Sequence, residues 1–262
     1  MTTESASLEL IRPDWPAPAS VQAFASTRCG GVSTGAYAGL NLGAHTGDNP
    51  AAVASNRALL RQRLALQNQP HWLNQVHGVA VAELTAELAT EKRTETIATV
   101  PVTADASVSR AVDTVCAVLT ADCLPVLFCD RAGQWVGAAH AGWRGLCAGV
   151  LEQTLAHYHG ARSELMAWLG PAIGPTAFEV GPEVRAEFVR HDAAAASAFR
   201  AGAADRWYAD LYALARQRLQ AAGVNAIFGG GFCTFSEPQR FYSYRRDQQT
   251  GRQATLIWRS AA

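Results

Sequence analysis

Three residues that can bind a metal stand out, because each occupies a short and distinctive motif. His77 lies in the segment NQVHG, Cys123 in TADCLP and His140 in HAGWRG. Each ends an apolar, strand-like stretch and precedes turn residues, where a rigid scaffold presents side chains to solvent. Two imidazoles and one thiolate are a typical catalytic zinc set, with a fourth position open to water or substrate. Their separations are too wide for a zinc finger, so an open, reactive site is predicted.

Taken singly, each of these residues has an ordinary structural explanation. A cysteine after an apolar strand is usually core packing, and a lone histidine such as His140 is more often a hydrogen-bonded core residue. The His-Gly pair at His77 is common in turns. Cys123 follows Asp122, and an acid beside a thiol raises the thiol pKa unless a metal or an imidazolium lowers it. A zinc-bound thiolate is therefore more reasonable at Cys123 than an isolated nucleophile.

Arginines accompany these motifs and predict an anion-binding pocket. Arg144 opens a predicted helix directly after the second histidine, and a helix N-terminus with an arginine can hold an anion. Arg28 begins a glycine-rich turn that lacks the Gly-Lys-Ser/Thr ending of a phosphate-binding loop. Tyr244 and Arg245 belong to an aromatic and basic segment that fits either a solvated hairpin or stacking with anion binding. We expect the anion to be bound by Arg28, Arg144 and Arg245.

The overall composition excludes several classes of partner. The chain has 262 residues, a formal net charge of zero and 17% charged residues. It has no run of Lys or Arg, so neither nucleic acid nor an anionic membrane is an expected partner. Residues 1–7 lack the basic and apolar regions of a signal peptide, and no apolar stretch is long enough to span a bilayer. The six scattered cysteines are interpreted as reduced thiols in a cytoplasmic protein.

Helical and strand-like segments alternate along the chain. A helix is predicted to begin at Pro50, after the capping residue Asn49. Further helices are predicted at 146–157, 183–191 and 210–221, whereas 85–99 and 192–204 are weakly patterned, the latter possessing the composition of a surface helix. Strands are predicted at 7–11, 21–27, 71–76, 79–83, 104–109, 115–119, 124–129, 134–139, 166–169, 178–180, 226–229, 241–244 and 255–258, with a hairpin turn at 130–133. Hairpins combined with crossover helices predict one domain over 1–262, an α/β sandwich with a mixed sheet.

The motifs together resemble the YfiH/YlmD family of laccase-domain proteins, some of which carry a polyphenol-oxidase label. The resemblance covers about residues 20–258 and follows one order of motifs: 28–33, 39–43, 74–78, 120–125, 140–145, 170–174 and 244–252. It implies a single-domain α/β/β/α sandwich with mixed sheets, related to bacterial toxin deamidases. It also implies zinc on His77, Cys123 and His140. Substrate binding is assigned to the following matched positions: Arg28, Asn41, Arg144, Tyr244 and Arg245.

The resemblance implies two activities on small molecules. The first is phosphorolysis of adenosine, inosine, guanosine or methylthioadenosine, with deamination of adenosine. Deamination requires a carboxylate that transfers a proton beside a zinc-activated water. Asp122 is favoured over Glu179 because it adjoins a ligand, although a role in orienting a ligand or capping a turn is equally consistent. The second activity is removal of serine from a UDP-muramoyl-amino acid. It would use the same zinc, so the motif residues do not distinguish the two activities.

Two further interpretations are disfavoured. A multicopper oxidase needs a blue copper site with two histidines and a cysteine, plus a three-copper cluster held almost wholly by histidines. The chain has seven histidines, too few of them in a suitable context. Copper at the three predicted ligands is therefore a lesser alternative to zinc. A non-catalytic metal-binding protein would not require an open-sided ligand set that shares a pocket with arginines.

Overall fold

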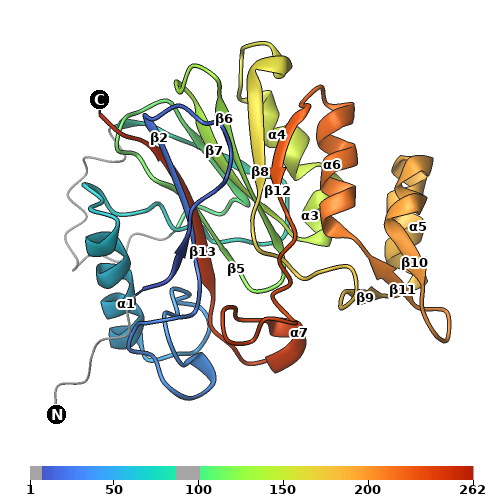
Figure 1. The fold of residues 1–262 in the computed structure, drawn as a ribbon, viewed down its shortest axis with the longest axis horizontal. Helices are drawn as coiled ribbons and strands as arrows, with labels where there is room; N and C mark the ends of the chain where they lie inside the picture. The colour runs from blue at the N-terminus through green and yellow to red at the C-terminus, as the bar shows by residue number, and fades with distance from the viewer. Residues whose placement is uncertain (1–7, 87–100, 262) are drawn as a thin grey trace.

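The structure, a computed structural model, describes residues 8–86 and 101–261 and contains two sheets packed face to face (Figure 1). The first sheet has four antiparallel strands in the order β1-β2-β13-β5. Its strands are β1 (Leu10–Ile11), β2 (Val21–Ser26), β5 (Cys116–Thr120) and β13 (Gln253–Arg259). One helix, α1 (Pro50–Arg63), covers its outer face through Leu60.

The second sheet is mixed and has the strand order β12-β8-β6-β7-β4-β3. Two strand pairs at its edges, β12 with β8 and β3 with β4, are parallel, and the others are antiparallel. Its strands are β3 (Val81–Leu84), β4 (Ala106–Ser109), β6 (Leu124–Asp130), β7 (Val136–Ala141), β8 (Leu165–Leu169) and β12 (Ala226–Gly229). With helices outside both sheets, the expected α/β/β/α sandwich with mixed sheets is confirmed.

The central strand β6 shows why its sequence forms an inner layer of this sandwich. Successive side chains of a strand point to opposite faces, and a strand buried on both faces is apolar throughout. Val126 and Phe128 pack toward the helices, whereas Leu127 and Cys129 pack between the two sheets. Both sets are fully buried, which fixes the register of β6 and the position of the residue that precedes it.

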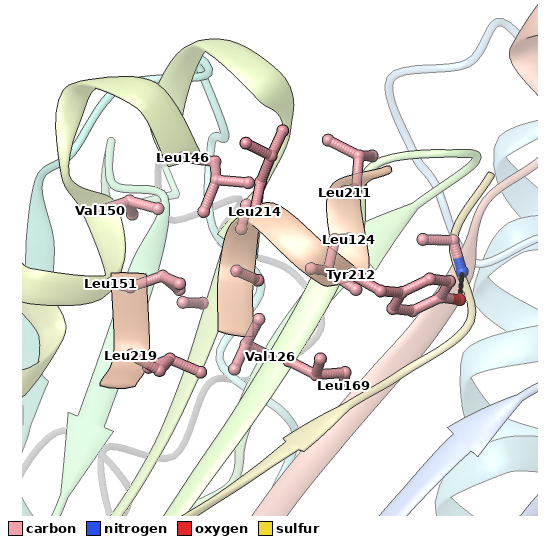
Figure 2. Packing of buried hydrophobic residues seen from close by; sticks show 14 of the residues in the cluster. Leu124, Val126, Leu146, Val150, Leu151, Leu169, Leu211, Tyr212, Leu214 and Leu219 are labelled. Atoms are coloured by element: carbon pink, nitrogen blue, oxygen red, sulfur yellow. Dashed lines mark hydrogen bonds between the residues drawn. The ribbon is translucent and has the colours of Figure 1, made fainter. Parts of the chain in front are cut away.

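Three helices cover the outer face of the six-stranded sheet (Figure 2). They are α3 (Trp143–Ala148), α4 (Val150–Ala156) and α6 (Leu211–Ala221). Leu146, Leu151 and Leu214 from these helices pack against Val126 and Leu169 of the sheet. The Tyr212 hydroxyl accepts a hydrogen bond of 2.9 Å from the backbone N–H of Ala172. This contact fixes the loop after β8 against α6.

A smaller element projects beside α6 (Figure 1). It is a three-stranded antiparallel sheet in the order β10-β11-β9 with one helix packed on it. Its parts are β9 (Glu179–Val180), α5 (Pro182–His191), β10 (Phe199–Ala201) and β11 (Trp207–Ala209). Phe188 of α5 and Phe199 of β10 join the core beneath the helices, so this element is continuous with the main body.

Several local predictions are confirmed. The Asn49 side chain caps α1 by accepting from the backbone N–H groups of Ala51 and Ala52. The turn at 130–133 forms with a 3.0 Å bond from Gly133 N–H to the Asp130 carbonyl. Strand β12 occupies the predicted range. Among the described residues no helix is long and apolar enough to cross a membrane.

Other local predictions are wrong, for identifiable physical reasons. The helix predicted at 146–157 is two helices, because Gly149 adopts a left-handed conformation with φ of 103° between them. The predicted strand 241–244 does not form. The segment instead enters the short helix α7 (Tyr244–Asp247), capped by the Ser243 side chain, and β13 pairs with β2 and β5.

Three further segments differ from expectation, the strands predicted at 7–11 and 71–76 and the alanine-rich stretch 192–204. Over 71–76 the described pairing is limited to isolated bridges at His71 and Asn74. The alanine-rich stretch forms the 3-10 helix η3 (Ala193–Ala198), followed by β10, rather than a surface α-helix. Strand β1 spans two residues of the predicted 7–11. Most of the segment 85–99 lies outside the described residues.

Candidate metal site and adjoining cavity

The structure brings together the three metal-capable residues of the sequence motifs. The ligand atoms of His77, Cys123 and His140 all lie within 4.8 Å of one another. Cys123 Sγ is 3.8 Å from His77 Nε2, and the two imidazole rings meet edge to face with centroids 4.8 Å apart. In residues 8–86 and 101–261 this is the only such group of three or more side chains.

The ligands come from neighbouring strands and one adjacent loop. Cys123 directly precedes β6, and His140 lies near the end of β7, where it pairs with Pro125 of β6. His77 lies in the loop before β3 and has a left-handed backbone, with φ of 61°. Such a conformation is unfavourable for a residue with a side chain and persists only where surrounding contacts impose it.

Those contacts come from Asp105, a fully buried acid that the sequence analysis missed. Its carboxylate accepts the backbone N–H groups of Val76, His77 and Gly78 at 3.2, 2.9 and 2.7 Å. It also lies 2.9 Å from Nδ1 of His140. An Nδ1–H donated to a carboxylate orients the ring and leaves Nε2 for a metal. Asp105 thus positions two of the three ligands.

The ligand set fits zinc. Typical Zn–S and Zn–N bonds in a tetrahedral site place sulfur and nitrogen about 3.6 Å apart. The separation of 3.8 Å between Cys123 Sγ and His77 Nε2 is close to this value. Two imidazoles and one thiolate are borderline-soft donors, and three protein ligands leave a fourth position open. The residues can therefore hold one metal ion with space for a ligand.

The electrostatics of the cluster favour the metal-binding form of the thiol. Burial disfavours the Cys123 thiolate, but the adjacent imidazoles of His140 and His77 outweigh it and lower the thiol pKa. Burial by itself would lower the pKa of His140, but Cys123 and Asp105 outweigh burial and raise the pKa to about 9. At the core thiols Cys116 and Cys129, in contrast, burial raises the pKa of each to about 12. Cys123 is set apart from these core thiols.

Two glycines of the 140–145 motif allow this close packing. A Cβ on Gly142 would lie 2.9 Å from Cys123 Sγ and 3.0 Å from Cδ2 of His77. A Cβ on Gly145 would lie 2.8 Å from the carbonyl oxygen of Gly78. Both positions therefore require glycine so that the start of α3 can approach the ligands.

A cavity of about 150 Å³ opens beside Cys123. The aromatic side chains of Trp143, Phe178 and Tyr244 form much of its wall, with the guanidinium-bearing Arg245 beside them. It combines an apolar, ring-lined surface with the ligand thiol at one side. A larger hollow of about 900 Å³, at the outer face of β2 and β13, includes none of the ligands.

Asp122 also lines this cavity, and hydrogen bonds hold its carboxylate in place. Oδ1 accepts the Thr234 hydroxyl at 2.6 Å, and Oδ2 accepts the backbone N–H of Arg245 at 2.7 Å. Its carbonyl accepts the N–H of Ile173 at 2.9 Å. The backbone is left-handed, with φ of 92°. Asp122 thus joins the start of β6 to the opposite wall of the cavity.

The predicted anion-binding arginines do not converge. Arg28 donates to the carbonyls of Pro238 and Ala38, and its guanidinium lies over the Tyr242 ring. Arg144 is exposed and stacks on Trp143 with its guanidinium carbon 4.4 Å from the ring centroid. Only Arg245 lines the cavity. Its Nη1 donates to the Glu179 carbonyl at 2.7 Å.

Asn41 is buried and its amide is used within the protein. Oδ1 accepts the N–H groups of Gly43 and Arg252, and Nδ2 donates to Thr46 and Asp48. Asn41 therefore positions the backbone at Arg252. That arginine is not among the predicted substrate-binding residues. It is close enough to Cys123 and Asp122 for their charges to raise its pKa, against the larger effect of burial. The only sequence feature that could have pointed to it is its position in the last matched motif, 244–252.

Comparisons with known proteins agree with the motifs. A family model described as multi-copper polyphenol oxidoreductase laccase matches residues 22–260. The chain is 55% identical to the Escherichia coli protein named purine nucleoside phosphorylase YfiH, covering 95% of this chain and 98% of that protein. It is also 55% identical to purine nucleoside phosphorylase PA4543 of Pseudomonas aeruginosa, with 95% and 97% covered.

Two solved structures share this architecture. The Neisseria meningitidis protein NMB0706 superposes with a TM-score of 0.88 at 49% identity, covering 96% of this chain and 99% of that one. YlmD from Geobacillus stearothermophilus superposes with a TM-score of 0.84 at 30% identity, covering 99% and 100%. The motifs and the fold agree with these matches, and the chain belongs to the YfiH/YlmD family of laccase-domain proteins.

Proposed function

We propose that this protein is a zinc-dependent purine nucleoside enzyme with one catalytic domain over residues 1–262. Its reactions would be phosphorolysis of adenosine, inosine, guanosine and methylthioadenosine, and deamination of adenosine. The observation that carries the proposal is the opening of a ring-lined cavity directly beside the His77, Cys123 and His140 cluster. Relatives that are 55% identical over nearly their full length and are named purine nucleoside phosphorylases support it.

Zinc is the metal proposed for the cluster. A multicopper oxidase would need several additional histidine-rich sites, and among the described residues one candidate cluster is found. A bound zinc ion would supply Lewis-acid polarisation of an oxygen atom at neutral pH. Asp105 would keep the His140 ring in the tautomer that presents Nε2, and would hold the loop that carries His77.

The cavity walls suit a purine base. Rings of Trp143, Phe178 and Tyr244 offer flat apolar surface against which a heterocycle can stack. The volume of about 150 Å³ is below the roughly 300–1,000 Å³ of most ligand pockets. We therefore place the base inside the cavity and the sugar at its mouth.

Asp122 is proposed to position the site rather than to move a proton. Its two oxygens accept hydrogen bonds from Thr234 and from the backbone of Arg245, and these bonds join the two walls of the cavity. A positioning role requires both bonds, whereas a general acid or base must exchange a proton with the substrate. Glu179, the other candidate carboxylate, contributes its carbonyl to Arg245, and its side chain does not line the cavity.

The experiment is a product assay on purified, zinc-loaded protein in two tubes. One contains adenosine with inorganic phosphate, and the other contains UDP-muramoyl-serine. Free adenine or inosine in the first tube alone supports the proposed function. Free serine in the second tube alone identifies the amidase alternative. Absence of product in both tubes, with zinc bound, would reject the proposal for these substrates.

A further inference from the structure

We infer that Arg252 binds a phosphate group at the edge of the cavity, through the edge of its guanidinium formed by Nε and Nη2. This inference deepens the proposed function, on which it rests for the use of phosphate. It replaces the sequence-based expectation that Arg28 and Arg144 bind the anion.

The first support is the hydrogen bonding of the Arg252 side chain. Nη1 donates to the carbonyls of Thr250 and Gly251, each at 3.0 Å, which closes a local turn. Within the part of the chain that the structure describes, no protein acceptor bonds to Nε or Nη2. These two groups present parallel N–H bonds, the arrangement that binds a carboxylate or phosphate in a bidentate manner.

The second support is the fixed position of this guanidinium. The Arg252 backbone N–H donates to Asn41 Oδ1 at 2.9 Å. Its side chain runs against Gly43, where an added Cβ would lie 2.8 Å from Arg252 Cγ. An arginine held in this way loses less conformational entropy when it binds a ligand. The role of Asn41 is thus indirect, because it aims Arg252.

The third support is the relation of Arg252 to the cavity. Its guanidinium carbon lies 5.9 Å from the centroid of the Tyr244 ring, and Tyr244 lines the cavity. The charges of Cys123 and Asp122 act on Arg252 and raise its pKa against the larger opposing effect of burial. The Asp122 carboxylate accepts hydrogen bonds from Thr234 and the backbone of Arg245. Among the described residues Arg252 forms no ion pair, so it flanks the site with its charge available to a ligand.

A cationic neighbourhood strengthens this position. Burial lowers the pKa of His45, and the nearby guanidinium groups of Arg252 and Arg57 lower it further. Arg57 donates Nε and Nη2 to the Leu42 carbonyl, so its bidentate edge is already used. A phosphate beside Arg252 would relieve the repulsion between these groups.

Three other arginines near the site, Arg28, Arg144 and Arg246, lack this combination. Arg28 donates hydrogen bonds from both Nη1 and Nη2 to backbone carbonyls. Arg246 is bonded to Asp247 and to three carbonyls. Arg144 extends from α3, a six-residue helix, and stacks on its neighbour Trp143. Among these four arginines, only Arg252 pairs a fixed side chain with an open bidentate edge inside the described structure. Arg245 lines the cavity and also keeps Nε and Nη2 without a protein acceptor among the described residues, so it could bind the same phosphate from the other side.

The phosphate group could have two sources. It could be the inorganic phosphate used in phosphorolysis, or the diphosphate of a nucleotide-linked substrate. We therefore propose titration of zinc-loaded protein with inorganic phosphate and, separately, with uridine diphosphate, following each dissociation constant by calorimetry. The variants are Arg252→Lys, which keeps the charge and removes the bidentate edge, and Gly43→Ala, which displaces the same side chain. Arg200→Lys, at another tyrosine-stacked arginine on β10, is the matched control.

We expect both Arg252→Lys and Gly43→Ala to weaken phosphate binding, the first by about tenfold or more. Arg200→Lys should bind as the wild type does. Weaker binding of inorganic phosphate identifies the co-substrate, and weaker binding of uridine diphosphate alone identifies a phosphate carried by the substrate; either result supports the inference. Wild-type affinity for both probes in both test variants would overturn it. Weaker binding seen only in an additional variant, Arg144→Lys, would overturn it as well.

Failure of this inference is distinguishable from failure of the proposed function. Binding is measured without turnover, whereas the proposed function is judged by release of a purine product. A protein that releases no purine but loses phosphate affinity in Arg252→Lys would refute only the proposed reaction. A protein that releases adenine but binds phosphate equally well in both variants would refute only the role of Arg252.

Discussion

The two sides of the cavity are built in opposite ways. On the metal side, His140 lies in the six-stranded sheet and Asp105 directly precedes its strand β4, and the two are 3% and 0% exposed. On the opposite side, Tyr244 lies on α7, a four-residue helix in a long connection, and is 52% exposed. The first side is fixed by strand pairing and a buried carboxylate. The second is held by hydrogen bonds within loops, among them those that Asp122 and Asn41 accept from the backbone N–H groups of Arg245 and Arg252.

This difference separates the residues that hold the metal from those that bind the substrate. Ligands of a reactive metal need positions held within a fraction of an ångström, which strands and buried hydrogen bonds provide. Substrate-binding groups on loops can adjust to the bound molecule. We therefore expect substitutions on the metal side to abolish metal binding and turnover together. Those on the loop side should change substrate affinity while the metal is retained.

The largest effect is expected for Cys123→Ala. Removal of the thiolate leaves two imidazoles, so zinc affinity should fall by more than about 100-fold and turnover should be lost. Metal content after dialysis, measured beside turnover, checks this. Cys147→Ala, at a core thiol of α3, is the control and should retain zinc. Equal zinc content in Cys123→Ala and wild type would remove Cys123 from the site.

A smaller effect on the metal is expected for Asp105→Asn. The amide cannot accept all four hydrogen bonds, so the His77 loop and the His140 ring lose their orientation. Zinc affinity should fall by about 10–100-fold, and an unpaired buried N–H should cost about 1–3 kcal/mol of unfolding free energy. Chelator competition and denaturant unfolding measure the two losses. Asp205→Asn, at an exposed left-handed position, should change neither.

The smallest effect is expected for Asp122→Asn. An asparagine can accept the Arg245 N–H and donate to the Thr234 hydroxyl, so the link between the two walls is kept. Turnover should stay within a few-fold of wild type. Asp122→Ala breaks the link and should raise KM, with zinc content unchanged in both variants. A large loss of kcat in Asp122→Asn, with normal KM, would show instead that Asp122 transfers a proton.

The sequence was informative where local patterns decide structure. The apolar runs that become β6 and β7, the cap at Asn49 and the turn after Asp130 all follow from nearest neighbours. The three ligands were identified because each lies at the end or beginning of such a run. The predicted strand 241–244 failed because the pairing of β13 is decided by strands more than one hundred residues away.

The supporting residues of the site were harder to predict. Asp105 is a single acid within an apolar stretch, which signals a buried partner but does not name it. Its partners, Gly78 and His140, lie 27 and 35 residues away. Arg28 was among the predicted anion ligands and Arg252 was not, because sequence alone does not show that carbonyls occupy both Nη groups of Arg28 but only Nη1 of Arg252. The break at Gly149 likewise depends on packing beyond the helix itself.

A zinc titration of metal-free protein tests the central claim most directly. Purine release from adenosine and phosphate is followed as zinc is added in fractions of one equivalent per chain. The account predicts that activity rises in proportion to zinc, reaches its maximum at one equivalent and then remains constant. Full activity in the metal-free protein, or a requirement for several equivalents of copper, would contradict a single zinc site formed by His77, Cys123 and His140.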